Sequence, residues 1–221
     1  MENPNQMGER PVTHDDRTLS KVRYTLIEGG LSDLLAMEYV RGRDLGSVIG
    51  DTGQLTSERT ARIILQVCSS LAEAHDMGIV HRDLKPENIM IVQGQSGEDV
   101  AKVLDFGLAK LRESSELSDV TSSGSIVGTP YYMSPEQIRG EDIGPASDVY
   151  ALGAVLYACV TGTVVFDAPT PMGVLTRHLT EQPQPPSLRA PGCAIPKGFE
   201  RIIMTALVKD PGARFPIAAV F

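Results

Sequence analysis

The sequence predicts an α+β fold in which short strands flank one helix in the first half of the chain and helices fill the second half. Two apolar segments, residues 22–27 and 34–40, flank the turn EGGLSD and are typical of paired strands. Two more, residues 89–92 and 100–104, flank QGQSGED and predict a hairpin. Beyond the polar segment ESSELSDVTSSGS, which is typical of a long loop, the patterns are helical.

A long helix is predicted between the two pairs of strands. Thr56 is expected as its N-cap, and Glu58 in its first turn is an anion that the helix dipole favours. Gly78 is expected to end it. The preceding segment RGRDLGSVIGDTGQ is expected as a loop with one helical turn. The helix is predicted because apolar residues recur on one face at helical spacing: Ile63, Ile64, Val67, Cys68, Leu71 and Ala74.

A charge-free segment, residues 149–166, raises the choice between a membrane span and a buried helix. A span needs roughly 20 apolar residues. This segment is shorter, contains Gly153 and Gly162, and lacks basic flanking residues, so a buried core helix capped by Ser147 is the better interpretation. A Pro-rich connection then leads to a last helix, which is expected around residues 199–208.

Composition narrows the class of protein. The chain has 221 residues, enough for one large domain or two small ones, and 42% of them are hydrophobic, enough to form a core. A net charge of −8 argues against a nucleic-acid partner bound by bulk neutralisation of phosphates, but it permits a single nucleotide. Cys68, Cys159 and Cys193 show no metal-binding spacing, which favours a reducing, cytoplasmic compartment. The polar residues 1–20 predict a disordered leader and no secretory signal.

Two short stretches carry the chemistry. The first, IVHRDLKPENIMIV at residues 79–92, sets charged side chains and a histidine between two apolar runs. By itself such a cluster is usually a solvated surface loop. The second, VLDFGLA at residues 103–109, places Asp105 at the end of an apolar strand, where a carboxylate can hold a hard cation, and Gly107 permits a sharp turn. Alone, the second stretch is also compatible with a simple strand-end turn.

Taken in order, five motifs resemble those of serine/threonine protein kinases, in particular the eukaryotic-like kinases of bacteria. They are HRDLKPEN, DFG, GTPYYMSPEQ, SDVYALG and KDPGARF, and the resemblance covers residues 34–221. It implies a protein-kinase-like fold that is mostly the helical C-terminal lobe, residues 41–221. Residues 21–40 would be remnant strands of the small N-terminal lobe and the hinge. The catalytic loop would span residues 79–92 and the activation segment residues 105–136.

The resemblance implies a catalytic group around the HRD motif. Asp83 is the expected base for the proton of the substrate hydroxyl, and Lys85 would lie beside the transferred phosphate. Asn88 and Asp105 are the expected Mg²⁺ ligands, since oxygen ligands suit this hard ion. Thr129 would hydrogen-bond near the base, and with Lys85 it favours serine and threonine over tyrosine acceptors. Taken alone, Lys85 is also compatible with a solvated lysine and Asp105 with a strand-end cap.

The resemblance also implies an ATP site. Glu38 and Val40, which follow Met37 in the gatekeeper position, match the hinge whose backbone groups bind the adenine edge. Met90 would form the floor beneath the adenine. The implied nucleotide-binding set is Glu38, Val40, Lys85, Glu87, Asn88, Met90 and Asp105. The implied partners are therefore Mg-ATP and proteins that offer Ser or Thr hydroxyls.

Other residues match structural positions of the family. His81 and Phe106 correspond to its internal hydrophobic spine. Asp148 would accept hydrogen bonds from backbone N–H groups of the catalytic loop, although alone it is also compatible with a charge at a helix N-terminus. Glu136 and Arg214 match a buried ion pair that ties the activation segment to the helical lobe.

Arg82, immediately before the expected base, suggests regulation by phosphorylation. In the family an arginine here pairs with a phosphate on the activation loop. A phosphate carries nearly two negative charges and three acceptor oxygens, so it can order the loop against Arg82. We predict autophosphorylation, foremost at Thr121 or Ser123; the alternative is that these are ordinary linker residues. The candidates in this loop are Thr121, Ser122, Ser123 and Ser125.

The sequence departs from the family before the hinge. No GxGxxG precedes Glu38, and Lys21, the lysine found there, lies in SKVRY and not in a V-A-x-K context. We therefore expect a truncated N-terminal lobe and weakened ATP binding. The alternative to an active kinase is a truncated pseudokinase that serves as a docking module. A third interpretation is a protein anchored in a membrane by the charge-free helix; full-length relatives are often membrane-anchored. The sequence indicates no oligomeric state.

Overall fold

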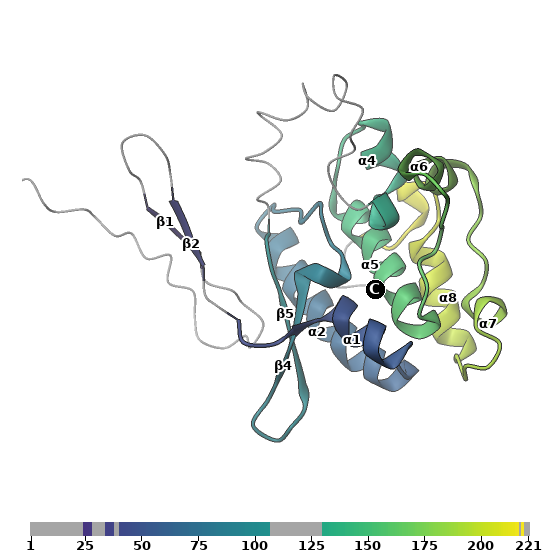
Figure 1. The fold of residues 1–221 in the computed structure, drawn as a ribbon. Coiled ribbons are helices and arrows are strands. Elements are labelled where there is room, and N and C mark those ends of the chain that lie inside the picture. The colour runs from purple at the N-terminus through teal and green to yellow at the C-terminus, as the bar shows by residue number, and fades with distance from the viewer. Residues whose placement is uncertain (1–23, 28–33, 38–39, 107–129, 217, 219–221) are drawn as a thin grey trace, which may run out of the picture.

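A computed structural model of the chain describes residues 24–27, 34–37, 40–106, 130–216 and 218 (Figure 1). Strands β1 (Tyr24–Ile27) and β2 (Leu34–Met37) form an antiparallel pair. A second antiparallel sheet has the order β3-β4-β5. Its strands are β3 (Arg43–Asp44), β4 (Ile89–Gln93) and β5 (Asp99–Val103). The strand pair predicted at residues 22–27 and 34–40 and the hairpin predicted at residues 89–92 and 100–104 are confirmed, and strand β3 was not predicted.

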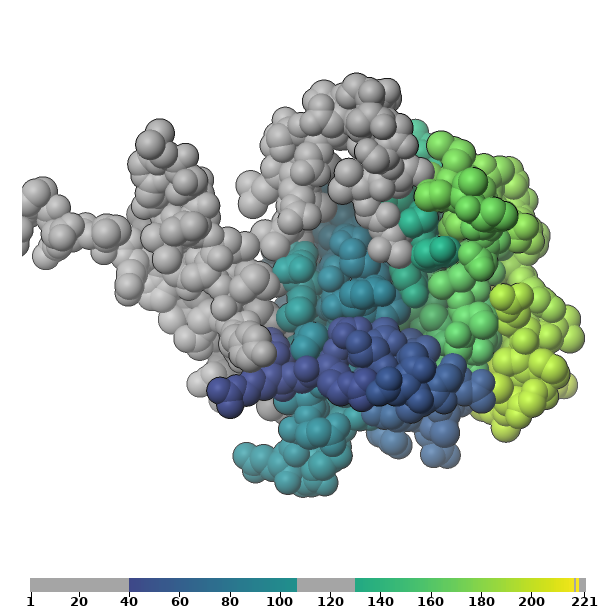
Figure 2. Space-filling model, viewed as in Figure 1, coloured from purple at the N-terminus to yellow at the C-terminus, as the bar shows by residue number. Residues whose placement is uncertain are grey.

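The segment expected as a loop with one turn forms helix α1 (Leu45–Thr52), which corrects that prediction. Asp44 caps it: one carboxylate oxygen accepts the Ser47 N–H at 2.7 Å and the other accepts the Ser47 hydroxyl at 2.6 Å. The apolar face of α1 is buried and contacts β4. Figure 2 shows α1 on the visible face, beside the teal residues of the β4–β5 hairpin. Burial and a strong cap therefore outweigh the low helix propensity of its two glycines.

Helix α2 (Ser57–Asp76) confirms the prediction of a long amphipathic helix. The Thr56 side chain accepts the Arg59 N–H at 3.2 Å, as expected of an N-cap. At the other end Gly78 has a φ of 72°, in the left-handed region that favours glycine. The buried face of α2 lies against β5 and helix α5.

Helix α5 (Pro145–Thr161) is the centre of the body (Figure 1). It is buried on every face, with α2 on one side and α8 (Lys197–Ala206) on the other, which confirms the predicted core helix. Among the described helices none is long and apolar enough to cross a bilayer. The predicted cap is wrong, because α5 begins three residues earlier than a Ser147 cap implies, with Gly144 at the N-cap position. Ser147 instead donates its hydroxyl to Glu136 at 2.6 Å.

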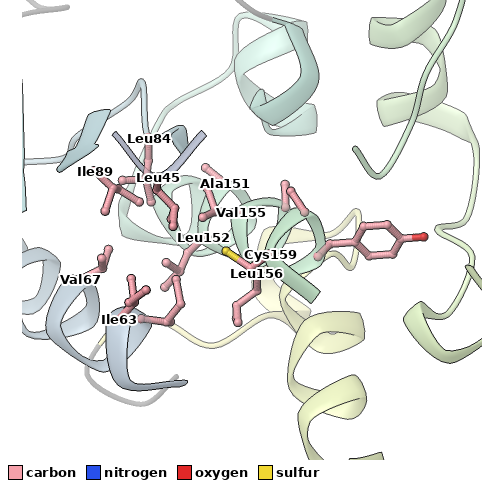
Figure 3. Close-up of a cluster of buried hydrophobic side chains, with 14 of the residues drawn as sticks. Leu45, Ile63, Val67, Leu84, Ile89, Ala151, Leu152, Val155, Leu156 and Cys159 are labelled. Carbon is pink, nitrogen blue, oxygen red and sulfur yellow. The ribbon is translucent and has the colours of Figure 1, made fainter. Parts of the chain in front are cut away.

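The hydrophobic core joins these helices to the segment around the HRD motif. Figure 3 shows Leu45 of α1, Ile63 and Val67 of α2, and Leu84 and Ile89 converging on α5. Because Leu84 and Ile89 are buried, the polar residues between them are held against a rigid base. The remaining elements are α4 (Pro135–Arg139), α6 (Pro171–Thr180), α7 (Pro186–Arg189), η1 (Pro86–Asn88), η2 (Pro130–Tyr132) and η3 (Pro211–Ala213).

Candidate active site

The register of the β4–β5 hairpin brings the two expected metal ligands to one end of the sheet. Ile89 pairs with Val103, so the residues just before β4 lie beside those just after β5. The Leu104 N–H donates to the Asn88 carbonyl at 2.8 Å and continues this pairing by one step. Asp105 follows with a φ of 62°, an uncommon left-handed conformation for a non-glycine residue. A segment far along the chain is thereby placed next to the HRD segment.

Asp148 holds the backbone of the HRD segment. Its carboxylate is buried, and it accepts the His81 N–H at 2.8 Å and the Arg82 N–H at 2.9 Å. Arg82 has a φ of 69°, so this pair of hydrogen bonds stabilises a backbone conformation that costs about 1–2 kcal/mol in isolation. His75 also contacts Asp148, with its Nε2 2.8 Å from the carboxylate.

Sequence reasoning missed His75, although one signal was available. A histidine in the last turn of α2, one residue after buried Ala74, lies at the end of the helix that enters the HRD segment. Its side chain is 2% exposed, and its Nδ1 has no hydrogen-bond partner among the described residues. The contact with Asp148 joins residues 73 positions apart, which no local pattern encodes.

The His81 ring links the two expected motifs. The Asp83 N–H donates to His81 Nδ1 at 3.3 Å, so the proton of a neutral ring is on Nε2. That nitrogen lies 2.8 Å from the Leu104 carbonyl, which it can then donate to. The Phe106 ring packs edge-on against His81, with 4.9 Å between the ring centroids. His81 therefore contacts both Asp83, the expected base, and Phe106 of the DFG motif.

Asp83 has the exposure and the neighbours of a general base. Its side chain is 54% exposed, whereas that of Lys85 is 19% exposed. Lys85 Nζ donates to the Asp83 carboxylate at 2.8 Å. The Asn88 amide nitrogen donates to the Asp83 carbonyl at 2.8 Å and lies 3.3 Å from its carboxylate. These donors orient the carboxylate while leaving it accessible to a substrate hydroxyl.

The donor set suits a magnesium ion that is held mainly by a nucleotide. Because the amide nitrogen of Asn88 is directed at Asp83, its amide oxygen is left to face a cation. Asp105 would add a carboxylate. The described residues contain no cluster of three or more His, Cys, Asp or Glu side chains able to hold a metal. Mg²⁺ commonly takes one or two protein ligands and completes its shell with phosphate oxygens and waters, so the residues present fit it.

A cavity of about 790 Å³ adjoins this group. It lies between α1, η1, η2 and the end of α5, with Glu87 and Met90 among its lining residues. Val40 is half-buried and does not line it. Asp44, which sequence reasoning did not select, contributes a second carboxylate to the wall. The other lining residues are Gly46, Ser47, Ile49, Gly50, Pro86, Tyr132, Ala158, Gly162, Thr163 and Val164.

A buried ion pair joins α4 to η3. The two terminal nitrogens of Arg214 donate to the two carboxylate oxygens of Glu136 at 2.7 and 2.9 Å. Burial alone would raise the pKa of Glu136, but the hydrogen bonds from Arg214 and Ser147 outweigh it, so the pKa lies below its ordinary value. The remaining donors of Arg214 bind backbone carbonyls, including that of Val208 at 2.6 Å. The pair is fully satisfied, as a buried charge requires.

Several predicted site residues lie outside the part of the chain that the structure describes. They are Glu38, Thr129, Thr121, Ser122, Ser123 and Ser125. The leader predicted for residues 1–20 also lies outside it. The predicted roles of these residues stay predictions.

A strand-end aspartate beside an HRD loop, on a helical body with a small sheet, defines a protein kinase domain. The chain belongs to the protein kinase domain family, which matches residues 24–221. A solved structure supports the fold: Rad53 residues 1–466 in complex with AMP-PNP superposes with a TM-score of 0.74 and is 26% identical. The match covers 92% of this chain and 49% of that one.

Curated relatives give the same family. The chain is 45% identical over 188 residues to the serine/threonine-protein kinase pkn3 of Myxococcus xanthus, covering 85% of this chain and 34% of the relative. It is 40% identical over 185 residues to the serine/threonine-protein kinase PknB of Mycobacterium tuberculosis, covering 84% and 28%. The chain thus spans about a third of the length of the curated relatives it matches.

Proposed function

We propose that this protein is a serine/threonine protein kinase that transfers the γ-phosphoryl group of ATP to protein hydroxyls. The observation that carries the proposal is the grouping of Asp83, Lys85 and Asn88 beside the strand end that bears Asp105. The names of the relatives, pkn3 and PknB, support an enzyme over the docking module considered above.

Within this proposal Asp83 accepts the proton of the acceptor hydroxyl as its oxygen bonds to phosphorus and the bond from phosphorus to ADP breaks. Lys85, 2.8 Å from the Asp83 carboxylate, offsets negative charge that develops on the phosphoryl oxygens. Asn88 and Asp105 would hold Mg²⁺, which would neutralise charge on the phosphates when bound. Thr129 hydrogen-bonds near the base and favours Ser and Thr acceptors.

The nucleotide and the protein substrate would approach from different sides of this group. Glu38 and Val40 bind the adenine edge by their backbone groups, with Met90 beneath the ring and Glu87 close by. That AMP-PNP is bound in the Rad53 structure supports a nucleotide site in this fold. The cavity between α1, η1 and η2 includes Glu87 and Met90 in its lining, and its η2 side, with Tyr132, offers a path for the polypeptide that carries the hydroxyl.

Regulation would act through the segment that follows Asp105. We propose that phosphorylation at Thr121 or Ser123 orders this segment against Arg82, because a phosphate pairs strongly with a guanidinium group. Ser122 and Ser123 are adjacent, so phosphopeptide mapping after incubation with Mg-ATP must resolve single residues. A segment that stays unmodified under conditions where the protein phosphorylates a substrate contradicts this part of the proposal.

The experiment that tests the function compares wild-type protein with Asp83→Asn in a transfer assay with radiolabelled ATP, Mg²⁺ and Ser/Thr peptides. Asp83→Asn keeps the size of the side chain but removes its basicity, and should lower the rate by about 10²- to 10⁴-fold. Asp210→Asn is the matched control, since Asp210 is exposed and caps η3. Equal background labelling in wild type and Asp83→Asn would exclude the enzymatic function for this chain.

A further inference from the structure

A second polar cluster lies apart from the HRD segment and links three parts of the helical body. Lys209, just after α8, donates from Nζ to the Tyr150 hydroxyl of α5 at 3.3 Å. The Tyr150 hydroxyl lies 2.8 Å from Nδ1 of His178 in α6. Phe166 covers both ends: its ring packs edge-on against His178 and lies 4.3 Å from Lys209 Nζ. Tyr150 and His178 are fully buried, so their polar atoms have no access to bulk water.

The chemistry of these groups favours one direction for the hydrogen bonds. A charged lysine can only donate, so the Tyr150 oxygen accepts from Lys209. Donation of the Tyr150 hydrogen to His178 Nδ1, 2.8 Å away, then satisfies both groups. Burial raises the pKa of the Tyr150 phenol, so the hydroxyl keeps its proton. A neutral His178 ring that accepts at Nδ1 carries its hydrogen on Nε2.

The His178 ring is neutral at neutral pH. Burial, and then the charge of Lys209, lower the pKa of His178 to about 4, while the Tyr131 backbone raises it. Tyr131 belongs to η2, which α6 contacts. Nε2 is buried and has no hydrogen-bond partner of regular geometry among the described residues, and the Tyr131 backbone of η2 is close enough to act on the ring.

We propose that His178 is a positioning residue for the protein substrate: the order Lys209 to Tyr150 to His178 locks the Nε2–H tautomer, which directs a donor at the backbone of η2. The lining of the proposed substrate cavity includes both Tyr132 of η2 and Glu87 of η1. This order of hydrogen bonds therefore sets the position of η2 relative to the acceptor hydroxyl. This inference rests on the proposed kinase function, and it adds a residue that none of the five motifs contains.

The test uses two tyrosines of one helix. Tyr150→Phe removes the hydroxyl that orders the tautomer and keeps the ring, which lies 4.8 Å from the Arg214 guanidinium. Tyr157→Phe is the matched control, because Tyr157 is equally buried in α5 but its hydroxyl has no partner among the described residues. The first measurement is the tautomer of His178, observed by long-range ¹H–¹⁵N NMR on protein labelled at its 4 histidines.

We expect the Nε2–H tautomer at His178 in wild type and in Tyr157→Phe, and a mixture of tautomers in Tyr150→Phe. The second measurement is steady-state kinetics: the peptide KM of Tyr150→Phe should rise by about tenfold, with kcat and the KM for ATP changed less than twofold. An unchanged tautomer in Tyr150→Phe, or a peptide KM equal to that of Tyr157→Phe, would overturn the inference. A wild-type chain that shows the expected tautomers but no phosphoryl transfer would instead count against the proposed function.

Discussion

Asp148 is the residue on which the geometry of the HRD segment depends most. Three donors converge on its buried carboxylate, two from the loop backbone and one from His75. Hydrogen bonds to a charged acceptor contribute about 1.5–3 kcal/mol each, and a buried donor left without a partner costs a similar amount. The position of Asp83 therefore depends on a carboxylate that is itself buried.

Replacing Asp148 by asparagine should destabilise the protein and slow it at once. The amide puts an N–H₂ group against at least one of the three donors, so we expect the free energy of unfolding to fall by about 3 kcal/mol. We also expect kcat to fall at least tenfold, because the loop that carries Asp83 loses one of its fixed backbone contacts. Urea denaturation and steady-state kinetics measure the two effects.

The control for Asp148→Asn is Asp210→Asn. Asp210 is exposed and accepts one backbone N–H, that of Gly212 at 2.9 Å. Loss of such an exposed cap costs about 1 kcal/mol or less and should leave kcat unchanged. If the two variants lose the same stability, Asp148 does not organise the loop in the way described.

At the scale of elements, the pair of Glu136 and Arg214 attaches helix α4 to η3 in the helical body. Glu136→Ala leaves the Arg214 guanidinium buried without its carboxylate, so we expect a loss of about 3–5 kcal/mol in the free energy of unfolding. Acid should act in the same direction. Because the pKa of folded Glu136 is lowered, its stabilisation is complete above the ordinary carboxyl pKa and is lost as the pH falls through the lowered value.

Urea denaturation of the single and double alanine variants at the two positions measures the coupling. A double variant much less destabilised than the sum of the single variants indicates that the two charges act as a unit. Additive losses would mean that each residue contributes through other contacts, such as the hydrogen bonds of Arg214 to the carbonyls of Val208 and Lys209.

Helix packing predicts opposite outcomes for two substitutions of glycine by alanine, one at the contact between α5 and α8 and one on the exposed face of α1. At Gly153 in α5 a Cβ would lie 2.7 Å from the Ala206 Cβ of α8, closer than packed atoms tolerate. We expect Gly153→Ala to cost about 1–3 kcal/mol by overpacking, although alanine favours the helix. At exposed Gly50 in α1 a Cβ would have no atom within 4 Å, so Gly50→Ala should stabilise by about 0.5–1 kcal/mol. Thermal or urea unfolding of both variants measures the two changes in stability. A loss of stability in Gly50→Ala equal to that in Gly153→Ala would contradict the packing argument.

For the whole molecule, the elements that were predicted correctly are those that local sequence patterns encode. Alternation and turn residues predicted the β4–β5 hairpin, and its register places Asn88 beside the strand end before Asp105. Helix α1 escaped prediction because Gly46 and Gly50 lower its propensity, whereas burial of Leu45 against the core stabilises it. Contacts between distant residues, such as that of His75 with Asp148, carry no local signal.

The same limit applies to the electrostatics of the core. Nothing in the chain around His178 indicates that it is fully buried or that Lys209 acts on it. Lys209 itself has its pKa lowered to about 8, first by burial and then by the Arg214 charge, while Glu181 raises it. Burial thus lowers the pKa of both His178 and Lys209. This effect depends on the folded structure and not on the sequence near either residue.

Buried His178 should make the whole domain sensitive to mild acid. The folded pKa is about 4 against an ordinary 6.5, so the unfolded chain binds a proton first as the pH falls. The stabilisation contributed by neutral His178 is complete at a pH above the ordinary pKa and declines as the pH falls below it. It is fully lost once the pH falls below the pKa of the folded protein. From neutral pH to about pH 5 we expect it to fall by about 2 kcal/mol. Urea denaturation across this range should therefore show a steeper fall for wild type than for His178→Gln, which lacks the titrating ring. Parallel curves for the two proteins would mean that His178 accepts a proton in the folded state as readily as in water.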